Sequence, residues 1–514
     1  MSNFAPYSNY GYISLIKEAT EGTAVKPTNY LRIISDTLLP SFNIAPVQEV
    51  AGDRERNIRS LKGQIEMAGD IVFNVESKMI GHFLRGMFGV PTTQTLTAGV
   101  AFRHIFTVTD TPKTYTIDAK VANSPWVHRF YGTKINQLSI ETADNKIQCT
   151  ASLMPRKAFI NAFVTTAVNS GTTLTVDQTS GLTTSDTILV IDKADGFTTV
   201  KELTITSIDS ETQLTVSTIN VQLDVNDIVV IKASTASYTQ DPVFALLGGT
   251  EISVGDDIDN LTAKDKENFS LSYQNEVEAK YASGHDEVSR FPADILTKGY
   301  SGTGNLSRFY DSELNIAKLR QNVKFALRVM LEGETAIEAN VAVKASSQFG
   351  TGTGFSVTAT TAGKAGNDIS VTMVIASVDT LSASITGNNV LISLASTTAS
   401  KNTGTLIAAA VNALTGVDSA AVSTGAEQFT TAISSVNLGF NSTGTNVAGR
   451  DASEKPYLQF DNADVRTDPY FVNNTEDAIV MEEIPLTFYK DIESGTYAKQ
   501  WSTRVFLVNN VSAY

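Results

Sequence analysis

The residues best able to bind a metal or act as nucleophiles are few in this chain. They are four histidines and one cysteine: His82, His104, His128, His285 and Cys149. No two histidines have the spacing of a metal-ligand pair, and no other nitrogen or sulfur ligand recurs near them. Cys149 lies in an alternating strand pattern, which favours a small buried hydrophobic residue over a reactive thiol. The sequence therefore predicts no metal site, and a single cysteine excludes an intrachain disulfide.

Short motifs for phosphate binding and acid–base chemistry are incomplete. Gly363-Lys364 has no glycine five residues ahead, so it is not a P-loop, and Gly350–Gly354 precedes a strand-like segment instead of a helix. The adjacent carboxylates Asp256-Asp257 and Glu482-Glu483 point to opposite faces if they lie on strands, so neither pair could share a substrate. We therefore expect a protein that is not an enzyme and holds no cofactor.

Two charged segments of mixed sign remain as candidates for function. Each is either a solvated loop or an arm that pairs with charges on a neighbouring subunit, and the presence of two matching segments favours arms. The residues expected to contact another subunit or ring are Asp53, Arg54, Glu55, Arg56, Arg59, Glu276, Glu278, Lys280, Asp286, Glu287 and Arg290.

Each charged segment precedes one copy of a sequence pattern that occurs twice in the chain. Gly69–Ser77 is echoed by Gly304–Ser312, and each copy reads as a strand that runs into a short helix. One charged segment lies upstream of each copy. A supersecondary unit repeated at wide spacing is typical of a structural building block, although coincidence of two strand–helix units was the alternative.

Composition limits the possible partners. The 514 residues carry a formal net charge of −15, and only 18% are Asp, Glu, Lys or Arg. This balance argues against wrapping nucleic acid on a basic surface, but it allows a surface that nucleic acid slides past. Met1–Tyr12 has no signal-peptide pattern, and no apolar run has the ~18 residues of a membrane helix. We expect a chain made in a cytosol, with no membrane partner.

Changes in composition and hydrophobic periodicity divide the chain into five segments and predict a mainly β fold. Residues 1–162 alternate as half-buried strands, with one helix at Lys78–Phe88 that Ser77 caps and Gly89 ends. Residues 163–237 contain regularly spaced short strands typical of a small all-β domain. Strand patterns resume in 238–335 and 453–514.

Between these last two segments, residues 336–452 predict a small α+β domain. A hairpin with a Gly387-Asn388 turn spans Leu381–Ile392, and an amphipathic helix contains Leu406 and Val411. The predicted layout is a first module (1–162), an insert (163–237), and a second module (238–335 and 453–514) that a second insert interrupts. Each module is expected to be a sandwich or barrel with a short helix.

The chain resembles bacteriophage tail tube proteins, most closely the double-module kind of long-tailed phages. Ile16–Ala24, Gly69–Phe73 and Gly302–Leu306 carry the resemblance, which covers the two modules. Residues 365–371 with the following helix are similar to modules embedded in phage virion proteins, and residues 163–237 resemble a virion surface module.

The resemblance implies rings that stack into a tail tube through which viral DNA leaves the capsid. It further implies three chains per ring with pseudo-sixfold symmetry, inserts on the outside, and contacts with tape measure, tail terminator and distal tail proteins. The protein would lie in the virion tail after assembly in the host cytoplasm. A distal tail or baseplate ring protein of the same fold, and a modular bacterial surface or adhesive protein, are the alternatives.

Overall fold

The computed structural model is mainly β, as the sequence predicts, and its strands form several sheets. It describes residues 11–48, 57–193, 200–238, 243–245, 249–259, 261–263, 268–282, 290–309, 323–339, 342–350, 352–439, 447–451, 453–467, 481–491 and 501–514. Within these ranges no sheet closes into a barrel, so the barrel form expected for a module is not adopted by the single chain.

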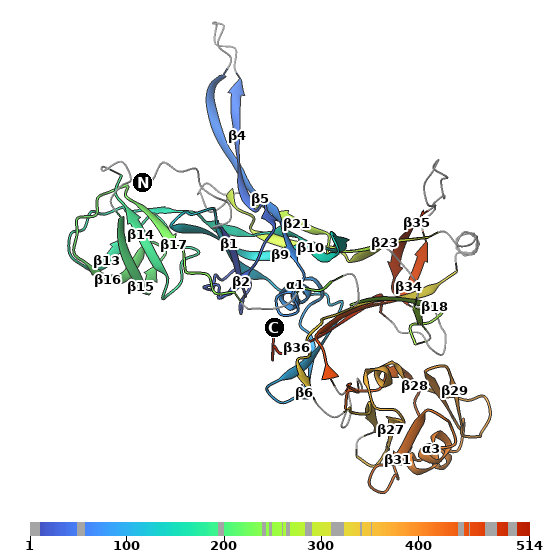
Figure 1. Cartoon of the computed structure of the whole chain (residues 1–514). Helices are drawn as coiled ribbons and strands as arrows, with labels where there is room; N and C mark the ends of the chain where they lie inside the picture. Colours follow the sequence, from blue (N-terminus) through green and yellow to red (C-terminus); the bar gives the residue numbers. More distant parts are fainter. Residues whose placement is uncertain are drawn as a thin grey trace.

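One antiparallel sheet runs through the centre of the molecule (Figure 1). Its strands, in order across the sheet, are β3 (Ser35–Asp36), β5 (Asn57–Asn74), β10 (Lys146–Met154), β9 (Trp126–Ala143), β20 (Asn268–Gln274), β23 (Ser301–Phe309), β35 (Met481–Tyr489) and β34 (Tyr457–Thr467). The first half of this sheet comes from the first predicted module and the second half from the second.

The two halves have the same connectivity. The order β3–β5–β10–β9 is followed by β20–β23–β35–β34, and β5 and β23 hold the two copies of the glycine-led sequence pattern. Outside this sheet, β1 (Tyr12–Lys17) pairs with β8 (Tyr115–Lys120) and β8 with β9. In the same way, β18 (Thr250–Gly255) pairs with β24 (Phe325–Glu332) and β24 with β34. We call these two halves the first and second repeat.

The repeats share one hydrophobic core. Phe73 and Leu153 of the first repeat and Leu271 and Leu486 of the second belong to the same buried cluster. Cys149 is also buried there, as expected, and burial raises the pKa of its thiol. The repeats are therefore one folded body, since neither could keep this core without the other.

Helix α1 (Ile80–Phe88) begins later than predicted. Met79 occupies the N-cap position, so the prediction that Ser77 caps the helix is wrong. The carbonyl of Ser77 instead accepts a hydrogen bond from Asn509 Nδ2 at 2.7 Å, which holds this residue in the turn before the helix. Gly89 ends the helix as predicted, with φ of 107° and its N–H bonded to the Arg85 carbonyl.

Residues 162–232 form a second packed unit, which we call the small β unit. Its strands are short, as the sequence predicts: β12 (Ala162–Phe163), β13 (Gly171–Thr175), β14 (Thr187–Ile191), β15 (Val200–Ser210), β16 (Gln213–Ile219) and β17 (Ile228–Lys232). Tyr12, Val127 and Phe159 of the first repeat belong to its buried cluster. Strand β17 also pairs with β9, so this unit is continuous with the first repeat.

Residues 346–437 form a third unit, the α+β unit, which lies apart from the small β unit in Figure 1. It contains β26 (Ser346–Phe349), β27 (Phe355–Ala359), β28 (Ser370–Ile375), β29 (Ser382–Thr386), β30 (Asn389–Leu394), α3 (Gly404–Val411), β31 (Val417–Ala421) and β32 (Ile433–Asn437). The hairpin around Gly387 is confirmed, since Thr386 pairs with Asn389. The expected apolar face of α3 is wrong at Leu406, which is 46% exposed, because Ile407 and Val411 face the core.

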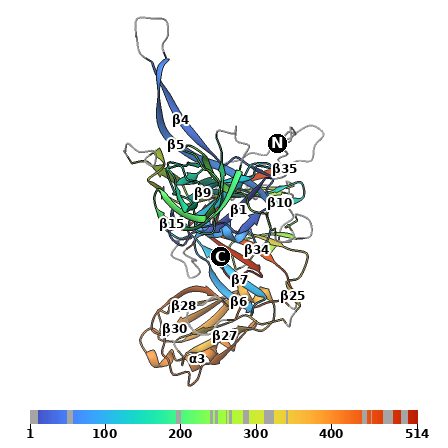
Figure 2. The same cartoon turned by 90° about the vertical axis from the view of Figure 1, so that its left-hand side faces the viewer.

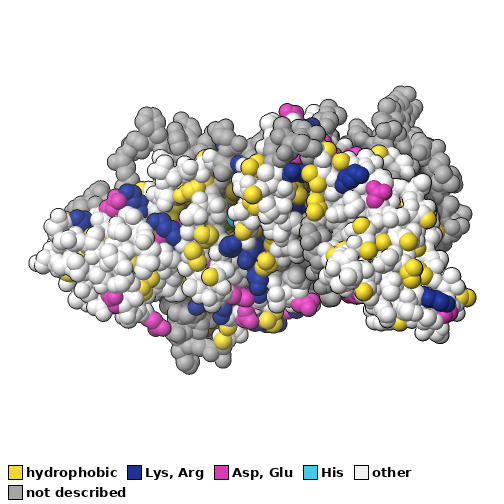
Figure 3. Space-filling view, turned by 90° about the horizontal axis from the view of Figure 1, so that it is seen from below, with side chains coloured by type: hydrophobic (Ala, Val, Ile, Leu, Met, Phe, Trp, Pro, Cys, Tyr) yellow, Lys and Arg dark blue, Asp and Glu magenta, His cyan; other side chains and the backbone are white. Residues whose placement is uncertain are grey.

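The surface carries both signs of charge. On the face seen in Figure 3, basic and acidic side chains are interspersed, and hydrophobic side chains are scattered among them. Among the described residues, no helix has the length and apolar character required to cross a membrane.

Candidate assembly surface

A long two-stranded arm projects from the body of the molecule. It consists of β4 (Leu39–Gln48) and β5, which pair from Leu39 opposite Ala68 outward to Val47 opposite Arg59. Figures 1 and 2 show the arm extending away from the central sheet, on the side opposite the α+β unit. Arg59 is thus on the arm, whereas Asp53, Arg54, Glu55 and Arg56 lie outside the described residues.

The arm carries exposed apolar side chains that the sequence analysis did not single out. They are Leu39, Phe42, Ile44 and Leu61, which are 57%, 51%, 59% and 58% exposed. One exposed apolar residue is ordinary, but several on one narrow hairpin indicate a surface that another molecule covers. The only available signal in the sequence was the apolar content of β4, which is equally typical of a buried strand.

Strand β4 has the properties of an edge strand. Within the described part of the chain it pairs with β5 alone. It contains Pro40 and Pro46, which have no N–H to donate to a further strand. The prolines therefore limit uncontrolled pairing along the arm while leaving its side chains available for contact.

The second charged segment forms a shorter hairpin. Strand β21 (Val277–Lys280) pairs with β22 (Asp294–Thr297), and both precede β23 as the arm precedes the core part of β5. Glu278 forms ion pairs with Lys280, at 2.5 Å, and with Lys298. Hydrogen bonds from these lysines lower the pKa of Glu278 to about 2. Glu278 and Lys280 are therefore already paired within the chain.

This second hairpin braces the base of the arm. Arg290 Nε donates a hydrogen bond to the Gly63 carbonyl at 2.8 Å, and the Tyr281 hydroxyl donates to the Ile65 carbonyl at 3.1 Å. Glu276 has a φ of 45°, and its carbonyl accepts a hydrogen bond from the Lys298 N–H. Asp286 and Glu287 lie outside the described residues. The structure thus brings Arg290 to the arm strand β5, which the sequence did not reveal.

The joint between the repeats is built from backbone pairing and buried side chains. Strands β9 and β20 pair with Ile140 opposite Leu271, and both residues have no exposed surface. Asn275 Nδ2 donates hydrogen bonds to the carbonyls of Met87 and Ile135, at 3.1 and 3.2 Å. The joint therefore connects two sheet edges of one chain through a ladder and a shared core.

The sheet also has an outer edge at the first repeat. Strand β3 pairs with β5 in the same way as β20 pairs with β23, but the described residues give β3 no second partner. The neighbouring Ile34 is 52% exposed. Such an edge invites pairing with another chain. At the opposite end of the sheet lies β34, which ends at Thr467.

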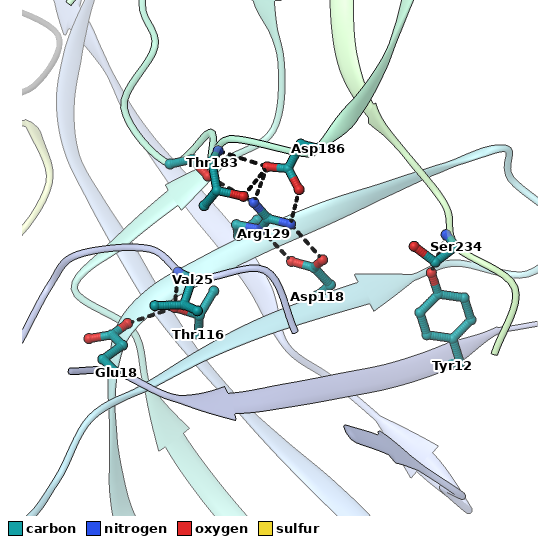
Figure 4. A network of polar contacts seen from close by, with 10 residues as sticks. Tyr12, Glu18, Val25, Thr116, Asp118, Arg129, Thr183, Asp186 and Ser234 are labelled. Carbon is teal, nitrogen blue, oxygen red and sulfur yellow. Dashed lines mark hydrogen bonds and ion pairs between the residues drawn. The ribbon is translucent and has the colours of Figure 1, made fainter. Parts of the chain in front are cut away.

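A buried ion network fixes the small β unit to the first repeat (Figure 4). Arg129 of β9 bonds Asp118 of β8 at 2.7 Å and Asp186 of the small β unit at 2.5 Å, and its side chain has no exposed surface. Burial alone lowers the pKa of Arg129, but the two carboxylates outweigh this effect and raise it, so the guanidinium stays charged. One guanidinium thus binds carboxylates from both sides, so the network connects the first repeat to the small β unit.

Comparison with known families gives one match. Residues 8–207 match the phage tail tube protein family. The match spans the first repeat and continues into the small β unit as far as β15. No curated protein matches the chain. Over these residues, which are less than half of the chain, the protein is similar to phage tail tube proteins.

The histidines that the structure describes have structural surroundings. His82 lies edge-on to the ring of Tyr514, and burial lowers its pKa to about 4. His104 bonds the Thr93 hydroxyl at 2.9 Å and the Val511 carbonyl at 2.8 Å. In the described ranges, no group of His, Cys, Asp and Glu side chains could hold a metal ion. His285 lies outside these ranges.

Proposed function

We propose that this chain polymerises as stacked rings into a phage tail tube that forms the channel for DNA ejection. The observation that carries the proposal is the sheet that passes through both repeats in the same strand order. The match of residues 8–207 to the tail tube family supports it. The internal joint between β9 and β20 then serves as the template for the joint between chains.

The repeat geometry suggests how a ring closes. The exposed edge at β3 would meet the far end of the second repeat in a neighbouring chain, as β20 meets β9 within the chain. Such head-to-tail contacts close into a ring when the rotation per chain divides a full turn. Closure also removes the open sheet edges. With two repeats per chain and the six repeats that the family resemblance implies, a ring contains three chains with pseudo-sixfold symmetry.

The arm would connect successive rings. Phe42 and Ile44 lie on β4 of the arm and are more than half exposed, so a subunit of the next ring would cover them. The mixed charges in the sequence between β4 and β5, with Arg59 on β5, would favour one docking register without nonspecific adhesion. The small β and α+β units, as domains inserted into the tube body, would project outward. Tape measure, tail terminator and distal tail proteins would be the other partners in the virion, after assembly in the host cytoplasm.

The proposal is tested by assembly of the purified full-length chain, alone and with tail-initiator components. Negative-stain electron microscopy is expected to reveal rings and hollow tubes, and light scattering a species of three chains before tubes grow. Monomers under both conditions would contradict the proposal. Rings that never stack, even with initiator components, would favour the distal tail or baseplate alternative.

A further inference from the structure

The two faces of the central sheet differ in chemistry. Along β9 the buried Leu138 and Ile140 alternate with Ser139, which is half-buried, and Glu141, which is exposed. Strand β20 shows the same alternation of buried apolar and accessible polar residues. Because successive side chains of a strand point to opposite faces, one face of the sheet packs on the shared core and the other is polar. We call the polar face the open face.

The open face is built of rows of side chains that cross both repeats. In the central row each residue lies opposite the next in the strand register, in the order Val72, Thr150, Ser139, Ser272, Thr303 and Thr487. A further row lies on each side of it, one from Asp70 to Ser301 and the other from Asn74 to Pro485. The joint between the repeats falls between Ser139 and Ser272, so the open face continues across it without a break.

The open face is polar but carries little charge. Among the described residues of the three rows, Asp70 and Glu141 are acidic and none is Lys or Arg, and most of the others are Ser, Thr, Asn or Gln. Some of these side chains bond one another. Gln137 Nε2 donates to Ser272 Oγ at 2.8 Å, and the Ser152 hydroxyl donates to the Asp70 carboxylate. Such a face binds water but offers no cation to a phosphate.

The inserted units are attached outside the three rows. The small β unit pairs with Val127, at the beginning of β9, and its Asp186 shares Arg129 with Asp118 of β8. The α+β unit is held by Arg328 of β24, which pairs with Asp368 at 2.8 Å. The inner layer of a closed ring has the shorter circumference. The bulk of α1, β8, β24 and both units therefore belongs at the larger radius, and the open face at the smaller one.

We propose that the open face lines the channel of the tube, and that its hydroxyl and amide side chains let duplex DNA pass without binding its phosphates. This inference rests on the proposed function and adds which side chains the DNA meets. The DNA backbone is held mainly by Lys and Arg, because each contact releases counterions. A face that lacks both residues, and whose charges at Asp70 and Glu141 are negative, gives the phosphates no such contact.

The first test measures the accessibility of Thr303→Cys in tubes assembled from the full-length chain. The native Cys149 is fully buried, so the introduced thiol dominates the labelling. Before assembly, Thr303→Cys is expected to react both with a small maleimide and with a maleimide coupled to a protein too large to enter the channel. In tubes it should lose reaction with the large reagent. Ser384→Cys, at an exposed position of β29, is the matched control and should react with both reagents in both states.

The outcomes separate this inference from the proposed function. Labelling of Thr303→Cys by the large reagent in intact tubes would overturn the inference, because the open face would then lie outside, while the tubes themselves would support the proposed function. Absence of tubes from the wild type would instead contradict the proposed function itself.

The second test places cations on the open face. Tubes of the double variant Gln274→Lys and Thr303→Lys, assembled with a short DNA duplex, are expected to retain duplex that a nuclease cannot reach and to release it as salt is raised. Wild-type tubes should retain no protected duplex. The matched control is Ser382→Lys with Ser384→Lys on the α+β unit, where bound duplex should be digested. Equal protection in all three kinds of tube, or none in the open-face variant, would overturn the role given to the uncharged side chains.

Discussion

Ile140 and Leu271 lie opposite each other on neighbouring strands, although one belongs to the first repeat and the other to the second. Their pairing makes one sheet from two sequence repeats and buries both side chains completely. At the ends of the sheet, β3 is the counterpart of β20 and β34 is the counterpart of β9, so the two ends correspond to the two sides of this internal joint. The account of a closed ring depends on this relationship.

The apolar side chains of the arm are expected to matter for assembly and not for folding. The double variant Phe42→Ser and Ile44→Ser should change the free energy of unfolding of the monomer by less than about 1 kcal/mol, because both side chains are more than half exposed. It should abolish or strongly reduce tube formation, measured by sedimentation and electron microscopy. The matched control is Ile375→Ser with Val378→Ser on the α+β unit, where the side chains are 53% and 61% exposed. Equal assembly by both double variants would show that the arm makes no apolar contact.

Gly81 is expected to be required by Tyr514. A Cβ at position 81 would lie 2.1 Å from the ring carbon Cζ of Tyr514. Helix propensity alone predicts that Gly81→Ala stabilises by roughly 1 kcal/mol, but overpacking against the ring should destabilise by about 1–3 kcal/mol. Urea unfolding of Gly81→Ala, Tyr514→Ala and the double variant forms a cycle that isolates this contact. A Gly81→Ala variant that is more stable than the wild type in the presence of Tyr514 would contradict this prediction.

The buried ion network is expected to be costly to break. Asp186→Asn leaves Arg129 buried with one carboxylate instead of two, and should destabilise the protein by about 3 kcal/mol. Glu202→Gln removes the exposed pair with Lys232 in the same unit, and should cost less than about 1 kcal/mol. Chemical denaturation monitored by intrinsic fluorescence would compare the two. Similar losses for both variants would contradict the role assigned to Arg129.

The junction of the α+β unit is expected to weaken as pH rises. Glu454 of β33 (Ser453–Glu454) pairs opposite Glu338 of β25 (Glu338–Ala339), at the strands through which the chain enters and leaves this unit. Burial raises the pKa of Glu454 to about 7. A hydrogen bond from the Asp451 N–H and the charge of Lys364 oppose this rise, and the negative charges of Asp451 and Glu332 add to it.

The folded state therefore binds this proton more tightly than the unfolded state, and the stability gained is lost as pH rises from about 4.5 to above 7. Relative to Glu454→Gln, the wild type should lose up to about 3 kcal/mol between pH 5 and pH 8. Glu211→Gln, an exposed site, should follow the wild type. Parallel pH profiles for the wild type and Glu454→Gln would refute the assignment.

Local patterns in the sequence predicted the elements well where a single physical rule decides them. The Gly387-Asn388 turn specified the β29–β30 hairpin, and Gly89 specified the end of α1. Ser77 does not cap α1 because the helix begins at Ile80, and the Ser77 carbonyl instead accepts a hydrogen bond from the distant Asn509, a contact that no local pattern contains.

Features that depend on distant pairing could not be read from the sequence. Tyr12, Val127 and Phe159 complete the core of the small β unit, and Arg129 connects two units through residues far apart in the chain. The arm was expected from its charges, but its exposed apolar residues Phe42 and Ile44 resemble those of any buried strand until the neighbouring elements are known. Alternation of apolar and polar residues specifies a strand with one buried face, but it does not show what covers the other face.

A cryo-electron microscopy reconstruction of the assembled ring tests the central claim most directly. The account predicts three chains per ring, with β3 of each chain joined to the second repeat of its neighbour as β20 is joined to β9 within the chain. The sheet would then be continuous around the channel, with the small β and α+β units outside it. A ring of six chains with twelve repeats, or one whose chains meet through the small β or α+β units while β3 stays unpaired, would contradict it.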